Sequence, residues 1–539
     1  MKRRNLFLSI ICSILMAVAL VTFTVISVVP NKNAGNNKNN AGQVSDNDGP
    51  KDDENLTIND DRDGSAEKPY IIYSAESFMT YVVGKYKGEN GNYIDYTATN
   101  ENGELLYPEL NKGLNYELKN DIDFAGSNFV TVFNEGIAFN GYIDGKGFAL
   151  KNISIELSKE NLNSYAKLGN DNRFSAYVGV FGKLDGAQIV NIKIADIKIA
   201  VADEVYAYVT SGEYATDKGA AMKQITVGTL AGVAYNTKLD EVVVSGTVDA
   251  GAYSVYASDF VQGFNAVGGV FGVADTCELT NISVDNKLVV DNGKKFFVGG
   301  VAGYAYETKL ANATVKSNIL ANYEQGLYVG GVYGYALAVN IDETQVALDV
   351  NETTIERFNT NGVKTVDDLK FIWVAGFVNR LVAETSADIT TISNSKVVAN
   401  VDIDGMYAGA VMDVYANAST TILNVKDVIL DSNVVVLKAY GFARTLVNAN
   451  IDMAKTEIDE VNELEFNIRL TGEVKLVKSD SGKDKLIVAK MFSNIGKDSK
   501  VSFVGGIASV KAVCSKAIYS NLELADYTLP FGGTGVKVI

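Results

Sequence analysis

The chain has 539 residues, of which 47% are hydrophobic, and its formal net charge is −17. This composition is typical of a folded chain with a sizeable core, and the acidic balance argues against nucleic acid as a partner, because phosphates require clustered Lys and Arg. The chain contains no histidine, which excludes Ser-His-Asp and Cys-His nucleophile systems and the HExxH zinc peptidase motif. Any catalysis would have to use Asp, Glu, Lys, Tyr or Arg.

Residues 1–29 predict an export segment. Three basic residues precede an uncharged, mainly apolar run from Leu6 to Val29, which is long enough for a helix to cross the hydrocarbon core of a bilayer. We expect either an uncleaved signal anchor, with residues 6–29 in the membrane, or a signal peptide that ends at Ala19. The first alternative places the remaining chain on the extracellular side of the cytoplasmic membrane, and the second makes it a secreted protein.

Residues 30–67 are rich in Asn, Asp and Gly and predict a disordered acidic linker, because they carry too few apolar side chains to offset the entropy of ordering. Residues 68–157 follow as an N-terminal cap and the first strands. Ser74 is placed to cap a short helix that runs to about Val83, and Gly84 would end it. We expect this helix to cover the first exposed strand edge.

Residues 158–510 carry a repeated Val-Gly-Gly-Val-x-Gly unit. Three strong copies, Val267–Gly272, Val298–Gly303 and Val329–Gly334, are 31 residues apart, and degraded copies precede and follow them. Each copy is followed by a second extended segment in which apolar residues alternate with a period of two. The pattern predicts an all-β solenoid in which valines form interior columns and glycines permit close backbone approach or a positive φ. The glycines assigned to this structural repeat are Gly179, Gly182, Gly228, Gly232, Gly268, Gly269, Gly272, Gly299, Gly300, Gly303, Gly330, Gly331, Gly334, Gly376, Gly409 and Gly441.

The spacing varies between copies, and the additional residues predict surface loops at Ser158–Arg173, Glu204–Met222 and Asn351–Asp368. Residues 511–539 form a C-terminal segment for which the sequence indicates no clear cap. Of the three cysteines, Cys277 and Cys514 are 237 positions apart, so no disulfide framework is visible and both are expected to be buried thiols.

The segments GSAEKPYIIYSAESF, LNYELKNDIDFAG, FNGYIDGKGFALKNISI and YVGVFGKLDGAQIVNIKI occur in this order. These segments resemble the start of bacterial surface proteins with GLUG-type repeats. The resemblance is good over residues 64–334 and continues in degraded form to about residue 510. The resemblance implies a right-handed parallel β-helix on an exported bacterial protein, in some cases an adhesin or an accessory region of a larger surface enzyme. One group with such repeats has zinc peptidase domains, and the absence of histidine means that this activity is not implied here.

Several residues are candidates for chemistry. Asp121 and Asp123 share one face of a strand and form either a carboxylate pair or part of a structural turn. The Asp144–Gly147 segment lacks the spacing of a phosphate-binding loop and predicts a β-turn with glycine in left-handed conformation. Trp373 lies in an apolar run that favours a place in the core. We predict no catalytic residue, metal site or cofactor.

Four tyrosines are candidates for ligand binding. Tyr304 and Tyr335 follow the last glycine of their copies and lie 31 residues apart, so adjacent copies would place them in a row, as a platform for sugar rings if exposed or a packing ladder if buried. Tyr235 and Tyr306 pose the same question three residues past their glycines.

Two function hypotheses follow from these patterns. The first is a non-catalytic surface protein, an adhesin-like binding or structural module whose rigid β-helix presents a face to carbohydrate or to a cell-surface protein. The alternative is a polysaccharide lyase or glycoside hydrolase that uses acidic residues on one face. The two differ in whether Asp, Glu, Lys or Arg side chains converge at one place.

Overall fold

The structure is a computed structural model. It describes residues 58–59, 61–83, 85–87, 93–95, 113–126, 133, 137–252, 265–352, 372–403, 405–435, 438–440, 442–454, 465–470, 492–495, 500–504, 511–514 and 537–538. The predicted export segment, most of the predicted linker, most of the Asn351–Asp368 loop and Gly441 lie outside these residues. Among the described residues, no helix is long and apolar enough to span a membrane.

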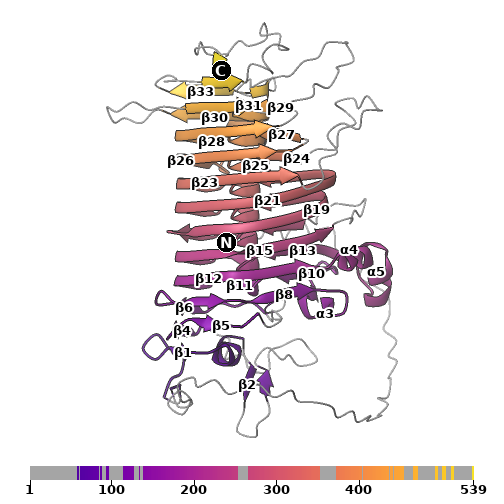
Figure 1. The fold of residues 1–539 in the computed structure, drawn as a ribbon, viewed down its shortest axis with the longest axis vertical. Helices are drawn as coiled ribbons and strands as arrows, with labels where there is room; N and C mark the ends of the chain where they lie inside the picture. The colour runs from indigo at the N-terminus through magenta and orange to yellow at the C-terminus, as the bar shows by residue number, and fades with distance from the viewer. Residues whose placement is uncertain are drawn as a thin grey trace. The chain divides into compact units, whose positions relative to one another are not determined.

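The described chain is mainly β, as predicted, and nearly all of its strand pairs are parallel (Figure 1). Strands of one repeat copy pair with the equivalent strands of the next copy, so the copies stack as layers. Antiparallel pairing within the described residues is confined to two places, β9 with β10 and β2 with β3. The first strands and these two exceptions are β1 (Tyr70–Ile72), β2 (Lys85–Lys87), β3 (Tyr93–Asp95), β4 (Asn115–Leu118), β5 (Ile122–Asp123), β6 (Tyr142–Asp144), β7 (Ala149–Lys151), β8 (Ser154–Leu157), β9 (Ala166–Leu168) and β10 (Phe174–Val178).

Each layer consists of a short strand, a bend at the glycines, a second short strand and a long strand. The short strands before the bend are β10, β13 (Met222–Gly228), β16 (Asn265–Gly268), β24 (Ile372–Ala375), β27 (Gly405–Ala408) and β29 (Lys438–Tyr440). The short strands after the bend are β11 (Phe181–Asp185), β14 (Ala231–Tyr235), β17 (Phe271–Asp275), β20 (Ala302–Tyr306), β22 (Tyr333–Leu337), β25 (Val378–Ala383) and β32 (Phe492–Ile495).

The remaining strands form the other part of each layer. Some of them, such as β19 and β21, continue as far as the glycine bend and so include the short strand before it. They are β12 (Gln188–Val201), β15 (Lys238–Ala252), β18 (Glu278–Thr280), β19 (Ser283–Gly299), β21 (Lys309–Gly330), β23 (Asn340–Glu352), β26 (Thr390–Asp402), β28 (Val411–Val435), β30 (Ala443–Ala454), β31 (Glu465–Leu470), β33 (Lys500–Val504), β34 (Lys511–Cys514) and β35 (Lys537–Val538).

The 31-residue spacing of the strong copies is also the sequence separation between register partners in adjacent layers. Val267 pairs with Val298, and Val298 pairs with Val329, each at the same place in adjacent layers. All three valines are fully buried and belong to one large hydrophobic cluster, which runs through the layers from Ile72 to Ala449. The predicted valine column is therefore confirmed. Cys277 lies in the same cluster as a fully buried free thiol, and burial raises its pKa to about 12.

The second glycine of each strong copy lies where the backbones of adjacent layers come close together. A Cβ added to Gly300 would overlap the carbonyl oxygen of Gly331 in the next layer, and a Cβ added to Gly269 would overlap that of Gly300. The amide of Gly300 donates a hydrogen bond of 3.2 Å to the carbonyl of Gly330, so the layers are bonded at this point. Of the two explanations that the sequence allows for these glycines, close approach therefore applies.

In the described repeats, positive φ recurs instead at two other bends, mostly at residues other than glycine. One column of such residues follows the first segment of the long strands: Asn191, Glu241, Asn281, Asn312, Glu343 and Asn394. Asparagine tolerates this conformation best among residues with a side chain. The Asn312 side chain donates a hydrogen bond of 2.6 Å to that of Asn281, which joins adjacent layers. This geometry accounts for the asparagines that recur at this position of the repeat.

The N-terminal helix is confirmed, with a difference in its form. Ser74 accepts a hydrogen bond from the amide of Ser77, and the Ser77 side chain returns the bond, which makes a capping box. Helix α2 covers only Ala75–Ser77 and continues as the π-helix η2, Phe78–Val82. Phe78 is buried and packs edge-on against Phe124, so the helix covers the first layers with an apolar face.

The sequence predicts a linker as far as residue 67, but the structure describes most of residues 58–67 as part of the fold. The buried side chain of Asn59 accepts a hydrogen bond from the amide of Ile71 and donates one to its carbonyl, at 2.8 and 3.1 Å. Arg62 donates to the carbonyl of Pro69 at 2.9 Å. These contacts extend the folded part of the chain to before residue 68. The polar composition of this segment did not predict these contacts, because they are hydrogen bonds from polar side chains to the backbone at and next to β1.

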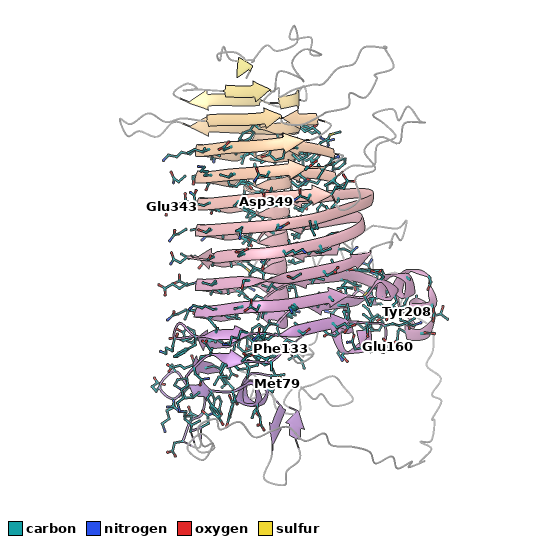
Figure 2. All side chains as sticks on the ribbon, in the orientation of Figure 1. Met79, Phe133, Glu160, Tyr208, Glu343 and Asp349 are labelled. Atoms are coloured by element: carbon teal, nitrogen blue, oxygen red, sulfur yellow. The ribbon has the colours of Figure 1, made fainter. Side chains whose placement is uncertain are left out.

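Two of the predicted loops contain helices. Ser158–Arg173 includes α3 (Leu162–Tyr165), and Glu204–Met222 includes most of α4 (Asp203–Thr210) and all of α5 (Glu213–Lys218). Tyr214 of α5 is buried and packs edge-on against Phe174 of the first repeat strand. Figure 2 shows Tyr208 of α4 beside the stacked strands. These helices are too short for a helical periodicity to be visible in the sequence.

A pair of glycine substitutions tests the close approach. Gly300→Ala should lower the free energy of unfolding by about 3 kcal/mol or more, because its Cβ meets rigid backbone of the next layer. Gly219→Ala, at a positive φ of 76° with nothing near its Cβ, should cost only about 1 kcal/mol. Chemical unfolding followed by circular dichroism measures both. Equal losses for the two variants would contradict the role given to Gly300.

Candidate functional site

Tyr304 and Tyr335 form the predicted row. They are register partners in β20 and β22, and their rings stack with centroids 4.8 Å apart and planes 11° apart. The ring faces between them are therefore covered, as in a packing ladder, while both side chains remain half-buried. Burial raises the pKa of each phenol.

Tyr235 and Tyr306 do not extend this row. Asp275 lies between them in the register, so they are two layers apart. The Lys183 ammonium lies 5.4 Å from the centroid of the Tyr235 ring. Burial, followed by a hydrogen bond with Glu307, raises the pKa of Tyr306 to about 12. Tyr235 and Tyr306 therefore do not stack on each other, because Asp275 occupies the layer between them.

A second column of rings, which sequence reasoning missed, comes from the strand before the bend. Phe297 pairs with Tyr328, and Tyr328 pairs with Trp373. Phe297 stacks on Tyr328 at 5.1 Å, and Tyr328 meets Trp373 edge-on at 4.7 Å. Across the bend, Phe297 meets Tyr335 edge-on at 5.2 Å. Together Phe297, Tyr304, Tyr328, Tyr335 and Trp373 form one continuous set of rings, which we call the aromatic strip.

The aromatic strip lies outside the main core. Val298, Val329 and Val374, each next to a strip residue in the sequence, belong to the large interior cluster, so the strip residues face the opposite way. The sequence favours a place for Trp373 in that core. It is instead half-buried against a small separate cluster of Ala375, Met406, Ala408 and Met412. The apolar run around it did not reveal which of its residues face inward.

One end of the strip carries two arginines and one aspartate. Arg444 donates to the buried carboxylate of Asp413 through Nε, at 2.8 Å, and through a terminal nitrogen. Its guanidinium also lies 4.8 Å from the centroid of the Trp373 ring. This pair is held by charge-assisted hydrogen bonds and a cation–π contact, so the charge of Asp413 is neutralised within the protein.

Arg380 follows Tyr335 in the register and precedes Asp413. Its guanidinium lies 4.8 Å from the centroid of the Tyr415 ring, and its charge favours the ionised form of both Tyr328 and Tyr335 against the effect of their burial. No carboxylate of a described residue lies within ion-pair distance of it. Arg380 is therefore a half-buried cation beside three phenols, and Asp413, its register partner, is occupied by Arg444.

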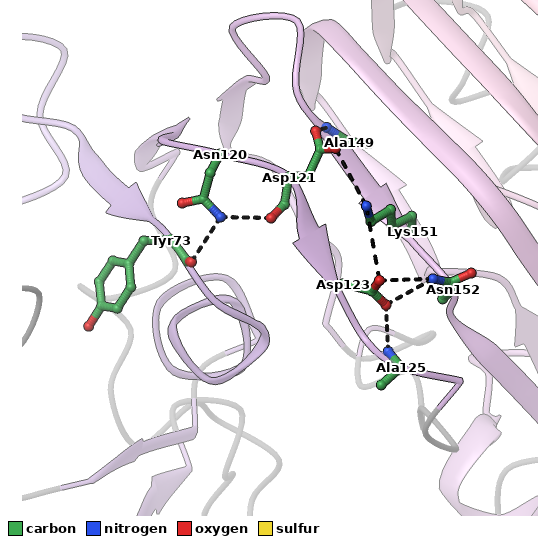
Figure 3. A network of polar contacts seen from close by, with 8 residues as sticks. All are labelled: Tyr73, Asn120, Asp121, Asp123, Ala125, Ala149, Lys151 and Asn152. Atoms are coloured by element: carbon green, nitrogen blue, oxygen red, sulfur yellow. Dashed lines mark hydrogen bonds and ion pairs between the residues drawn. The ribbon is translucent and has the colours of Figure 1, made fainter. Parts of the chain in front are cut away.

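The candidate carboxylate pair is part of the fold (Figure 3). Asp121 accepts a hydrogen bond of 3.0 Å from the amide of Ala149 and pairs with Lys151 at 3.5 Å. Asp123 accepts from the amide of Ala125 at 2.8 Å and from the Asn152 side chain at 2.9 Å. These bonds, that from Asn152 first, lower the pKa of Asp123. Both carboxylates therefore hold neighbouring strands together, which favours the structural alternative.

The Asp144–Gly147 segment is the predicted turn. Its left-handed conformation includes Lys146 as well as the glycine that follows it. Lys146 has φ 52° and Gly147 has φ 84°, and the amide of Phe148 donates to the carbonyl of Gly145 at 2.8 Å. The Lys146 ammonium pairs with Asp144 at 2.9 Å and with Glu117 at 3.2 Å. Among the described residues, no group of three or more Cys, Asp or Glu side chains is placed to hold a metal ion.

Comparison with known proteins adds no relative to this picture. No family model matches the chain, and no curated protein matches it closely enough to count as related. The class that the structure defines is therefore the broad one of mainly β proteins with parallel strand pairing between sequence repeats.

The pair that closes the strip gives a direct test. Arg444→Ala should lower the free energy of unfolding by about 3 kcal/mol, because it leaves the Asp413 carboxylate, 5% exposed, without its cation. Lys309→Ala breaks a pair in which both partners are largely exposed, 66% and 47%, and should cost less than about 0.5 kcal/mol. Chemical unfolding measures both. A small loss for both variants would contradict a buried ion pair at this site.

Proposed function

We propose that the chain is a non-catalytic protein of the cell surface, built as a right-handed parallel β-helix, that binds carbohydrate through the aromatic strip. The in-register stacking of layers supports the helix, and the resemblance to GLUG-type repeat proteins supports its hand. The apolar run Leu6–Val29 supports export, with the protein either anchored at the extracellular side of the cytoplasmic membrane or secreted.

The observation that carries the binding proposal is the strip itself. A solenoid needs its interior side chains for stability, whereas the strip places five rings outside the interior cluster. Half-buried rings with phenolic hydroxyls and arginines among them offer both apolar contact and hydrogen bonds, the combination that sugar rings require. The alternative partner is a cell-surface protein. Retention on immobilised glycans would distinguish carbohydrate binding from that alternative.

Binding is tested with the full-length chain on immobilised cellulose, mannan, polygalacturonate and methyl-esterified polygalacturonate. We expect retention on at least one, and a loss of about tenfold or more in affinity for Tyr335→Ala and for Trp373→Ala, because each removes a ring of the strip. Tyr208→Ala, on helix α4 and not part of the strip, is the matched control and should bind like the unmodified chain.

Two outcomes would count against the proposal. Retention that is equal in Tyr335→Ala, Trp373→Ala and Tyr208→Ala would place binding elsewhere. Release of soluble sugar products, abolished by one carboxylate substitution, would favour the lyase or hydrolase alternative. Thermal unfolding of each variant shows whether a loss of binding reflects a loss of fold.

A further inference from the structure

Arg380 differs from the other arginines whose side chains are described. Arg62 donates to two backbone carbonyls, Arg173 pairs with Asp171, and Arg444 pairs with Asp413. Arg380 has an aromatic contact with Tyr415 and no acidic partner among the described residues. In a chain with a net charge of −17, carboxylates are abundant, so an unpaired guanidinium beside the strip requires an explanation.

We propose that Arg380 selects acidic sugars, by pairing with the carboxylate of a uronate unit in a polysaccharide that lies on the aromatic strip. This inference rests on the proposed function. A guanidinium is the group best suited to a carboxylate, because it donates two parallel hydrogen bonds in one plane. The Tyr415 ring lies against the guanidinium, with 4.8 Å between them, and Tyr335 is the register partner of Arg380 in the adjacent layer.

The charged groups around Arg380 explain why this one residue would determine the preference for acidic sugars. The buried carboxylate of Asp413 is satisfied by Arg444 and does not compete for Arg380. Glu384 is exposed directly after the end of the same strand, and its charge raises the pKa of Tyr335. Glu384 therefore repels an anionic ligand, and the acidic protein as a whole does the same within a screening length. Attraction of a carboxylate depends on Arg380 alone among these groups.

The test compares polygalacturonate with its fully methyl-esterified form, which has the same backbone without the charge. In the full-length chain, Arg380→Gln should lower affinity for polygalacturonate roughly tenfold and change affinity for the methyl ester less than about twofold. Arg380→Lys keeps the charge but not the planar fork and should fall between. Glu384→Gln should shift affinity for polygalacturonate in the opposite direction, upward.

Lys183→Gln is the matched control. Lys183 occupies the same register column as Arg380, several layers away, and also lies over a tyrosine ring, that of Tyr235. It should leave both affinities unchanged. An equal loss in Lys183→Gln and Arg380→Gln would overturn the inference, because it would show a general effect of net charge.

The outcomes also separate this inference from the proposed function. Suppose that the methyl ester binds and that Arg380→Gln does not lower affinity for polygalacturonate more than affinity for the methyl ester. The acidic preference is then wrong, and glycan binding stands. If neither polymer binds the unmodified chain while another glycan of the panel does, the preference is again wrong. If no glycan binds, the proposed function fails and takes the preference with it.

Discussion

Adjacent layers approach so closely at the glycine bend that no side chain fits between them. A Cβ on Gly269, Gly300, Gly331 or Gly376 would overlap a carbonyl oxygen of the next layer, while the amide at each of these positions bonds across the same gap. Because side chains alternate across a strand, a slip of one residue would also turn each buried valine outward. The glycines and valines together therefore hold all layers in one register.

The aromatic strip is a consequence of that register. Residues 31 positions apart are brought directly above one another, so a tyrosine at one place in two copies becomes a stacked pair. The second column forms in the same way on the other side of the bend, and the bend brings Phe297 to Tyr335. Function, as we propose it, uses the outward positions of the same strands whose inward positions build the core.

The sequence predicts the repetitive part of this structure well and the site poorly. The 31-residue spacing, the valine column and the capping Ser74 all follow from local rules. Trp373 and the column of Phe297 and Tyr328 do not, because Thr226 and Ala266 occupy the same position in two earlier copies and an apolar run does not show which residues face inward. The pairing of Arg444 with Asp413 joins residues 31 apart in degraded copies, where no motif marks the register.

In-register parallel stacking is tested most directly by paired cysteines on exposed positions. Asp285 and Lys316 are register partners joined by an ion pair of 2.9 Å, whereas Lys287 is two residues further along its strand. Neighbouring strands lie about 4.8 Å apart, within the Cα range of a disulfide, and a two-residue offset adds enough to exceed about 7 Å. Under mild oxidation, peptide mapping should find a disulfide in the variant with Asp285→Cys and Lys316→Cys, and little in the variant with Lys287→Cys and Lys316→Cys. Preferential bonding in the second variant would contradict the register on which the core and the strip depend.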